Sequence, residues 1–394
     1  MSDETGPIDP LPPLVSLANA RTAFAVPPDV AYFNTASLSP MLHRAVAAGH
    51  AGLQSRATPW NFHERDWFDA VEVLRGLFAE VAGVDAEGVA LVPATSYGLG
   101  VVARNLPLAP GTDILVLAEE YPSGIYTWRA RSVGTDIRLV TVAREPGQTS
   151  WTEAVLAALD ERIGLVSVPN LHWTDGALVD LVAVARRARE VGAFLVVDAS
   201  QSLGVLPLDM AEVQPDAIVS VGYKWLLGPF GRAYLWVAEA HRAGRPLEQN
   251  WITRAGADDL SALVDYTDEF QPGARRYDQG ARTLIELTPI AIAALEQIRA
   301  WGVAQIGGAL AVVTADLAGG LGRLGLEPSA PPDRRAPHIL GIPVPDAARP
   351  RVLPALEQAG CYAALRGSSL RIAPHLHITP THVERLVSAV GSVL

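Results

Sequence analysis

Short apolar runs without strict polar–apolar alternation recur through the middle of the chain. Such runs are typical of strands that are buried on both faces of a mainly parallel sheet. Helix-like stretches at residues 151–162 and 178–191 lie between some of them, and Gly192 follows the second stretch as a suitable C-terminal cap. This alternation predicts an α/β fold with right-handed crossover connections. The five predicted strands are residues 114–118, 137–142, 163–168, 194–198 and 217–221.

The pattern changes after about residue 280. Helices are predicted at residues 288–301 and 309–324, then a proline-rich loop at 328–337 and an apolar strand at 339–344. A helix, two strands and a final helix complete the chain. We therefore predict an N-terminal arm (1–30) that packs on the last part of the chain. A large α/β domain with a mainly parallel sheet flanked by helices (31–280) and a smaller α+β domain (281–394) follow it.

Composition narrows the class of protein. The 394 residues are 49% hydrophobic, which suffices for a large core, and 31 basic residues face 42 acidic ones without any Lys/Arg-rich run. Nucleic acid is therefore not an expected partner.

The single cysteine, Cys361, excludes an intramolecular disulfide and fits a reducing compartment. The first 14 residues lack the features of a secretory signal, and apolar runs such as 163–169 are too short to span a bilayer. We expect a cytoplasmic protein without membrane contact or a metal site.

An aspartate closes one of the predicted strands, in the sequence V-V-D-A-S-Q-S at residues 196–202. In open α/β sheets, ligands bind at the carboxyl ends of strands. Asp198 at such an end can pair with a protonated ring nitrogen, as pyridoxal phosphate (PLP) requires, and Gln201 follows three residues later. The more common explanation of an aspartate in this position is a turn residue or a helix cap.

A lysine between two aromatic residues follows the next strand. Lys224 stands between Tyr223 and Trp225 and precedes a G-P-F-G segment. Partial burial by these rings lowers the pKa of an amine and makes it a competent Schiff-base nucleophile. A solvated surface lysine is the alternative. The aspartate motif 26 positions upstream, and a chain whose basic residues are nearly all arginines, favour the functional interpretation.

Small hydroxyl residues and glycines follow an earlier apolar run, in P-A-T-S-Y-G-L-G at residues 93–100. Thr95 and Ser96 at a strand-to-helix turn predict a phosphate site, because backbone amides at a helix N-terminus face the anion. A plain helix N-cap explains the same residues equally well.

The order of these three motifs resembles fold-type I PLP enzymes. More narrowly, residues 30–394 resemble the class V aminotransferase family, which includes cysteine desulfurases, isopenicillin N epimerase-like proteins and kynureninases. The resemblance implies PLP as the cofactor and Lys224 as the lysine that binds it and later moves protons. It also implies a set of cofactor contacts: Asp198 to the pyridine nitrogen, Gln201 near the phenolic oxygen, and Thr95, Ser96 and Tyr223 to the phosphate.

The resemblance extends to further positions around the cofactor and the substrate. Tyr121 matches the family's ring-stacking histidine, although a tyrosine there is often ordinary core, and Asn170 matches an asparagine near the cofactor's oxygen. Arg371 matches the arginine that grips the substrate α-carboxylate, with Arg366 in support. His172 beside Trp173 is a candidate for the substrate pocket, with a structural histidine as the more frequent outcome. The family also implies a homodimer with active sites at the interface.

Two positions depart from the family pattern. Desulfurases carry a nucleophilic cysteine before the arginine strand, but residues 366–370 contain none, and Cys361 is expected at the start of a buried strand. Persulfide formation is therefore disfavoured. Ala281 stands where the family often has a threonine that reaches the phosphate of the neighbouring subunit. This contact must then come from the backbone, from Arg282 or Thr283, or be missing.

The expected activity is the transformation of a small-molecule amino acid through an external aldimine and a quinonoid. Proton return to the cofactor gives transamination, return to the other face of Cα gives epimerisation, and a leaving group on Cβ gives elimination. We favour an aminotransferase or a Cβ–S lyase over an epimerase or racemase. A non-catalytic relative acting as an interaction protein is the alternative of another class, and a nucleotide-binding enzyme is weakened by the lack of a G-x-G-x-x-G run. The sequence does not name the substrate.

Overall fold

A seven-stranded sheet forms the centre of the computed structural model, which describes residues 10–145 and 150–394. Its strand order is β2-β8-β7-β6-β5-β3-β4, and only β8 runs antiparallel to its neighbours. The expected α/β fold with a mainly parallel sheet is therefore confirmed. The strands are β2 (Val89–Val92), β3 (Asp113–Leu117), β4 (Leu139–Val142), β5 (Ile163–Pro169), β6 (Phe194–Asp198), β7 (Ala217–Val221) and β8 (Ala233–Val237).

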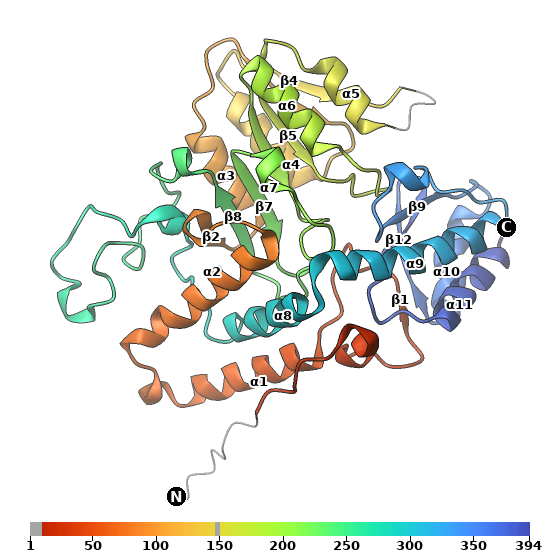
Figure 1. The fold of residues 1–394 in the computed structure, drawn as a ribbon, viewed down its shortest axis with the longest axis horizontal. Coiled ribbons are helices and arrows are strands. Elements are labelled where there is room, and N and C mark those ends of the chain that lie inside the picture. The colour runs from red at the N-terminus through yellow and green to blue at the C-terminus, as the bar shows by residue number, and fades with distance from the viewer. Residues whose placement is uncertain (1–9, 146–149) are drawn as a thin grey trace, which may run out of the picture.

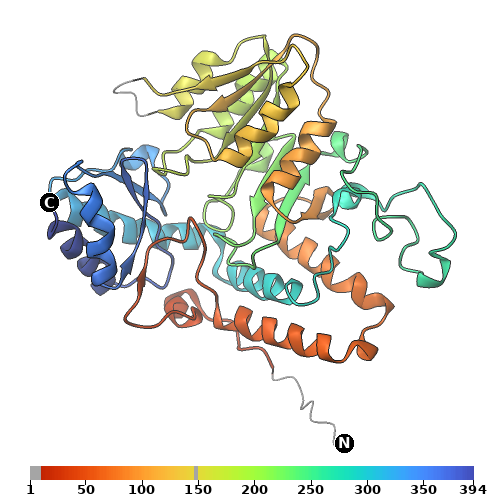
Figure 2. The same ribbon diagram turned by 180° about the vertical axis from the view of Figure 1, so that it is seen from behind.

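Helices cover both faces of this sheet (Figures 1 and 2). Helices α3 (Thr95–Asn105) and α4 (Pro122–Ser132) contribute to the apolar cluster on one face. The cluster on the other face includes residues of α2 (Asp69–Ala82), α5 (Trp151–Ala158), α6 (Leu181–Val191) and α8 (Thr288–Trp301). This cover explains why the strands are apolar on both sides. Two further helices of this part are α1 (His43–Ala57), beside α8, and the short α7 (Met210–Val213).

Some of the predicted helix ends agree with the structure and others do not. Helix α6 ends where expected, because Gly192 adopts the left-handed conformation, with φ of 76°, and caps it. Helix α5 ends at Ala158, four residues before the predicted end. Helix α8 has the predicted bounds, whereas α9 begins at Val303 and not at 309. Gly302, with φ of 80°, separates α8 from α9, so the two helices follow each other with a single residue between them.

A second, smaller body lies beside the C-terminus (Figure 1). Its antiparallel sheet has the order β11-β12-β9, and helices from the last part of the chain pack on it. A separate parallel pair joins β1 to β10, so residues 31 and 32 lie with the C-terminal body and not with the large sheet as expected. The pair is only two residues long, which is too short to give a sequence pattern. The elements are β1 (Ala31–Tyr32), β9 (Leu340–Pro343), β10 (Cys361–Tyr362), β11 (Ala364–Arg366), β12 (Ser369–Ile372), α9 (Val303–Gly322), α10 (Arg349–Gln358) and α11 (Pro380–Gly391).

The segment before β1 lies between the two bodies. Val15 exchanges hydrogen bonds with the side chains of Gln297 and Trp301 on α8. The Phe24 ring stacks on Trp301 and lies 5.2 Å from the ring centres of both His375 and His377, which follow β12. The arm therefore packs on the end of α8 as well as on the small body; residues 1–9 lie outside the described part.

Within residues 10–145 and 150–394, one helix is long and apolar enough to cross a membrane by length and composition alone. This is α9, of which a third of the apolar window is buried. Its buried leucines, Leu317 and Leu321, pack in the core of the small body, and the helix contacts α11. The apolar side of α9 therefore serves as a core helix face in this fold.

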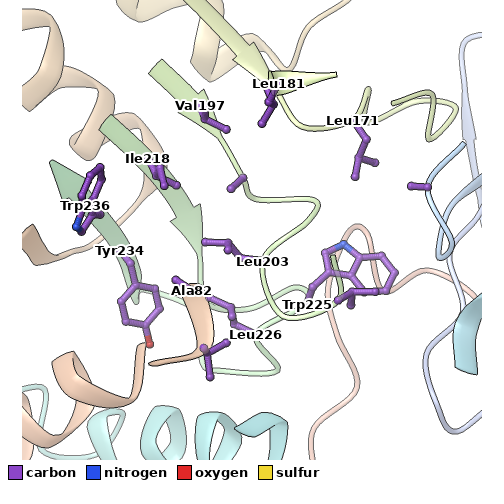
Figure 3. Packing of buried hydrophobic residues seen from close by; sticks show 14 of the residues in the cluster. Ala82, Leu171, Leu181, Val197, Leu203, Ile218, Trp225, Leu226, Tyr234 and Trp236 are labelled. Carbon is purple, nitrogen blue, oxygen red and sulfur yellow. The ribbon is translucent and has the colours of Figure 1, made fainter. Parts of the chain in front are cut away.

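The main core continues beneath the carboxyl ends of the strands. Figure 3 shows Trp225 in this core, with Leu171, Leu203 and Leu226 in the same cluster. Trp225 is the residue after Lys224, so the loop that carries the lysine is anchored in the largest apolar cluster of the protein. A rigid base for this loop follows from that packing.

Candidate active site

A small cavity opens at the carboxyl ends of β5, β6 and β7. This is the edge at which parallel α/β sheets bind ligands. Lys224 and Asp198 both line it, although their motifs are 26 residues apart in the chain. The other residues of its wall are Thr95, Glu120, Tyr121, Pro169, Leu171, Trp173, Ser200, Gln201, Val221 and Tyr223.

Lys224 is the only lysine in the chain and is 8% exposed. Its loop is closed by two backbone hydrogen bonds: the amide of Leu227 donates to Lys224 at 3.1 Å, and the amide of Gly228 donates to Gly222 at 2.8 Å. A Cβ at Gly204 would lie 2.3 Å from the carbonyl oxygen of Trp225, so only glycine permits this approach. The backbone of Lys224 is therefore held at one place in the cavity wall.

Gln201 supports the loop that carries Lys224 through a hydrogen bond to Trp225. Its side-chain carbonyl accepts a hydrogen bond from the Trp225 indole at 2.9 Å, and its amide nitrogen donates to the carbonyl of Ala36 at 3.0 Å. Gln201 lines the cavity as expected, but the contacts made in this structure hold Trp225. A contact to the cofactor's phenolic oxygen stays a prediction.

Burial sets the charge of the Lys224 amine. Loss of hydration lowers its pKa to about 8, while the carboxylate of Asp198 opposes this shift. Asp198 itself accepts a hydrogen bond from the amide of Ser200 at 2.9 Å, which fixes its carboxylate at the strand end. An amine with this pKa is partly neutral at physiological pH and can act as a nucleophile or a base.

Two tyrosines stand beside the lysine. The Lys224 Nζ atom lies 5.3 Å from the centre of the Tyr121 ring, and the ring remains 42% exposed. Tyr223 lines the cavity, its ring centre is 4.5 Å from that of Phe230, and burial raises the pKa of its phenol. The face of Tyr121 is thus available to a flat ring bound at Lys224, as the sequence prediction requires.

The start of α3 presents unpaired backbone amides beside the cavity. Ala94 occupies the N-cap position without a capping side chain, and no group in the described part of the chain accepts a hydrogen bond from the amides of Thr95 or Ser96. Thr95 is buried and lines the cavity, whereas the Ser96 side chain is exposed and does not. Unpaired amides at a helix N-terminus suit a phosphate group.

Glu120 is a cavity residue that the sequence did not reveal. Its Oε1 accepts a hydrogen bond from the amide of Tyr121 at 2.6 Å, but its buried Oε2 has no partner among the described residues. Burial, with repulsion from Asp198, raises the pKa of this carboxyl to about 8. Its only sequence signal was its place next to Tyr121, which did not distinguish it from the exposed Glu119.

Arg371 enters the same region from the small body. It lies on β12 and is 1% exposed; its Nη2 donates to Ser37 Oγ at 2.6 Å and its Nη1 to the carbonyl of Trp173 at 3.1 Å. Its Nε is buried without a partner in the described part of the chain. Burial and the neighbouring Arg366 lower the pKa of this guanidinium to about 9. A buried cation with a free donor requires an anion.

Arg366 and Trp173 complete this end of the site. The Arg366 guanidinium donates to Ser37 Oγ at 3.1 Å and lies 5.6 Å from the centre of the Trp173 ring. The Trp173 indole donates to the carbonyl of Glu119 at 2.7 Å and meets Tyr121 edge-on at 5.6 Å. Trp173 therefore connects the cofactor side of the site to the two arginines.

Two predicted residues lie away from the cavity. His172 is fully buried: its Nε2 donates to the carbonyl of Ala118 (3.1 Å), its Nδ1 pairs with Thr174 Oγ1 (2.8 Å), and its ring stacks on Trp151 at 4.7 Å. Both ring nitrogens have partners and His172 does not line the Lys224 cavity, so the structural alternative describes its place in this structure. Asn170 lines a different hollow, with Thr152 and Asp180 among its neighbours, and not the Lys224 cavity.

The structure also places Ala281 and Cys361, the two positions at which the sequence departs from the family pattern. Ala281 is exposed, while Arg282 donates to Asp278 at 2.7 Å and Thr283 donates to the carbonyl of Trp67 at 2.8 Å. Both neighbouring side chains are thus engaged inside this chain. Cys361 is buried in β10, and burial raises the pKa of its thiol. Such a thiol is a poor nucleophile.

The site as a whole fits the expected cofactor. A phosphate can lie at the first turn of α3, a flat ring can lie against Tyr121, and the carboxylate of Asp198 and the amine of Lys224 line the same cavity. The amides at the start of α3 have no partner in the described chain, and the Tyr121 ring is partly exposed, so both can contact a bound group.

Comparison with known proteins identifies the family of the chain. The Aminotransferase class-V family model matches residues 35–367. The chain is 26% identical over 358 residues to the uncharacterized aminotransferase YcbU of Bacillus subtilis, a match that covers 90% of this chain and 91% of the relative. It is 27% identical over 251 residues to the isopenicillin N epimerase of Amycolatopsis lactamdurans, covering 62% and 63%.

Solved structures share the fold. A mutant of C-DES with glycine covalently linked to its PLP cofactor superposes with a TM-score of 0.84 and 19% identity, covering 95% of this chain and 99% of that one. At this identity the likeness concerns the fold. The family expected from the motifs is confirmed by the family match.

Proposed function

The chain belongs to the class V aminotransferase family and is a PLP-dependent enzyme, and we propose that it transforms a small-molecule amino acid by amino-group transfer or by Cβ–S elimination. Lys224 is the covalent cofactor lysine of this proposal, and Arg371 binds the substrate α-carboxylate. One observation carries it: the only lysine of the chain and the strand-end Asp198 line one cavity, and the buried Arg371 lies near enough to lower the pKa of Lys224.

The residues divide the work between binding and proton movement. PLP, when bound, withdraws electrons from the substrate Cα. Asp198 would pair with the ring nitrogen of the cofactor, and the face of Tyr121 would orient the ring. The Lys224 amine, with a pKa of about 8, would take the proton from the substrate Cα and return it. Arg371 fixes the carboxylate, so that the Cα–H bond has one orientation toward Lys224.

The cysteine chemistry of desulfurases does not enter this proposal. The chain has a single cysteine, and Cys361 is buried with a raised thiol pKa in β10. A Cβ–S elimination needs no protein thiol, because the sulfur leaves with the electron pair of the broken bond. The cystine C–S lyase C-DES shares this fold, and YcbU is named an aminotransferase, which supports both outcomes.

The experiment is a product screen with the holoenzyme. A panel of amino acids and thioether conjugates is incubated with the protein, with and without a keto-acid acceptor, and products are measured by mass spectrometry and chiral chromatography. A new amino acid from the acceptor indicates transfer, and a keto acid with a free thiol and ammonia indicates elimination. Inversion at Cα alone, or no product with any substrate, would contradict the proposal.

A homodimer belongs to the same proposal. Phe230 is 71% exposed although its ring contacts the cavity residue Tyr223, which leaves a large aromatic surface open beside the site. The excursion around η6 (Leu260–Ala262) projects from the body (Figures 1 and 2) and carries the exposed Val264 and Tyr266. Both features support coverage by a second copy. Light scattering on the holoenzyme tests it, with a mass of one chain as the contradicting result.

A further inference from the structure

Arg366 and Arg371 lie side by side on one face of the small sheet. Ala364 pairs with Arg371 across β11 and β12, and Arg366 pairs with Ser369. Residues paired across strands share a face, as do residues two apart along a strand. The two arginine side chains therefore project in the same direction from adjacent strands.

Neighbouring groups hold the two guanidinium groups together. Both donate to Ser37 Oγ, and their carbons lie 5.6 and 5.7 Å from the centre of the Trp173 ring. Arg371 also reaches Asn34 Oδ1 at 3.3 Å. The main chain of residues 33–35 pairs with Ala373, and this pairing places the polar side chains beside β12. Hydroxyl, amide and indole contacts orient a guanidinium but leave its positive charge uncompensated.

Neither arginine has a carboxylate partner in residues 10–145 and 150–394. The salt bridges among the described residues include those of the buried Arg75 and Arg282 with Asp278. None of these salt bridges involves Arg366 or Arg371. The pKa of Arg371 reflects this, because Arg366 lowers it and no carboxylate raises it. Two adjacent cations thus remain where an amino-acid substrate is expected to bind.

The charges of a simple substrate do not match this pair. An α-carboxylate supplies one negative charge, so a neutral side chain would leave one guanidinium uncompensated in a partly buried place. Arg371 is fully buried and its Nε has no partner among the described residues, whereas Arg366 is only partly buried. Arg371 is therefore the better partner for the α-carboxylate, which is attached to the reacting Cα, and Arg366 is left for a group farther along the substrate.

We propose that the substrate is an amino acid with an acidic side chain, whose α-carboxylate binds Arg371 and whose side-chain anion binds Arg366. This inference rests on the proposed function. It makes Arg366 a specificity-determining residue with no part in the proton transfer. Trp173, packed against both guanidinium groups, keeps the two anion positions at a fixed separation.

The test measures binding and not turnover. Holoenzyme is titrated with aspartate against asparagine and with glutamate against glutamine, pairs that match in size and differ in charge, and the visible absorption of the cofactor reports saturation. The better acid should bind at least about tenfold more tightly than its amide, a difference of roughly 1.4 kcal/mol. Arg366→Gln should reduce this ratio to below about threefold and leave amide binding nearly unchanged, while Arg366→Lys should restore part of it.

Matched variants make the outcomes distinct. Arg371→Gln should weaken acid and amide alike, and Arg323→Gln, an exposed arginine after α9, should change neither. Equal binding of acid and amide by the unaltered protein would overturn the inference without reference to any variant. An equal loss of both ligands in Arg366→Gln would also overturn it, since Arg366 would then share the α-carboxylate. Neutral amino acids that bind and react, while acidic ones do not, would leave the proposed function intact and remove only this inference; the absence of binding by any amino acid would remove both.

Discussion

The amine of Lys224 points at the face of Tyr121, with 5.3 Å between Nζ and the ring centre. Tyr121 belongs to the start of α4 and Lys224 to the loop after β7, so the contact brings together two segments about a hundred residues apart. A flat group attached to the amine can stack on the phenol without moving the backbone. The predictions below start from this placement.

Replacement of Lys224 by alanine should abolish covalent cofactor attachment. Because the chain contains no second lysine, no other side-chain amine can substitute for it. Borohydride treatment followed by intact-mass measurement should show one added cofactor on the unaltered protein and none on Lys224→Ala. Retention of the cofactor mass by this variant would exclude Lys224 from the role.

Attachment of PLP to cofactor-free protein should depend on pH with a midpoint near 8. The reacting species is the neutral amine, whose fraction rises with pH through the pKa of about 8 that burial gives Lys224. The rate should therefore increase from pH 6 and level off above pH 9. Stopped-flow absorbance measures it, and a rate that continues to rise toward pH 10.5, as for an exposed lysine, would contradict the burial argument.

Replacement of Arg371 by alanine should weaken amino-acid binding far more than cofactor binding. Loss of a buried charge-assisted contact typically costs about 2–5 kcal/mol. The ligand affinity is measured by spectral titration and the cofactor occupancy by absorbance after gel filtration. A parallel loss of both quantities would indicate that the arginine supports the fold of the site and not the substrate.

Glu120→Gln should stabilise the cofactor-free protein at high pH. The raised pKa means that the folded state keeps a proton which the unfolded state releases above about pH 4.5, so stability falls as pH rises toward 8. Relative to the unaltered protein, the variant should gain roughly 2–4 kcal/mol at pH 9 and much less at pH 5. Urea unfolding measures the difference, with Glu119→Gln as the exposed control. A pH-independent difference would refute the buried-acid assignment.

Acid should destabilise the protein as histidines in the interior resist protonation. Burial lowers the pKa of both His338 and His377 to about 4, and His375 is lowered further, while the unfolded chain binds protons near 6.5. Stability is therefore lost as pH falls through 6.5 toward 4. Each of the first two groups contributes on the order of 3 kcal/mol to this loss. Denaturant unfolding between pH 8 and pH 4.5 tests this, and a shallower slope is expected for His338→Gln.

Much of the fold and the cofactor end of the site could be predicted from the sequence. Strands buried on both faces give continuous apolar runs, so β6 and β7 were predicted with their observed bounds. Lys224 and Asp198 follow those strands directly, and the parallel arrangement alone brings their side chains to one edge. For Lys224 and Asp198, the local strand pattern was therefore enough to predict where the side chains lie in the fold.

Other features depend on contacts that no local pattern records. β1 gains its partner from residue 361, and the buried Oε2 of Glu120 arises from packing around the cavity. The outcome for His172 depended on Trp151 and Ala118, which lie far from it in the chain. The family resemblance placed Asn170 near the cofactor, whereas the structure directs it to another hollow.

The site draws its parts from two separate sheets, and this division has an evolutionary consequence. Cofactor residues follow strands of the large sheet, while both arginines project from the hairpin of β11 and β12. Mutations in that hairpin can change which molecules are recognised while the catalytic chemistry is inherited unchanged. Grafting the hairpin from a relative is accordingly a direct route to altered selectivity.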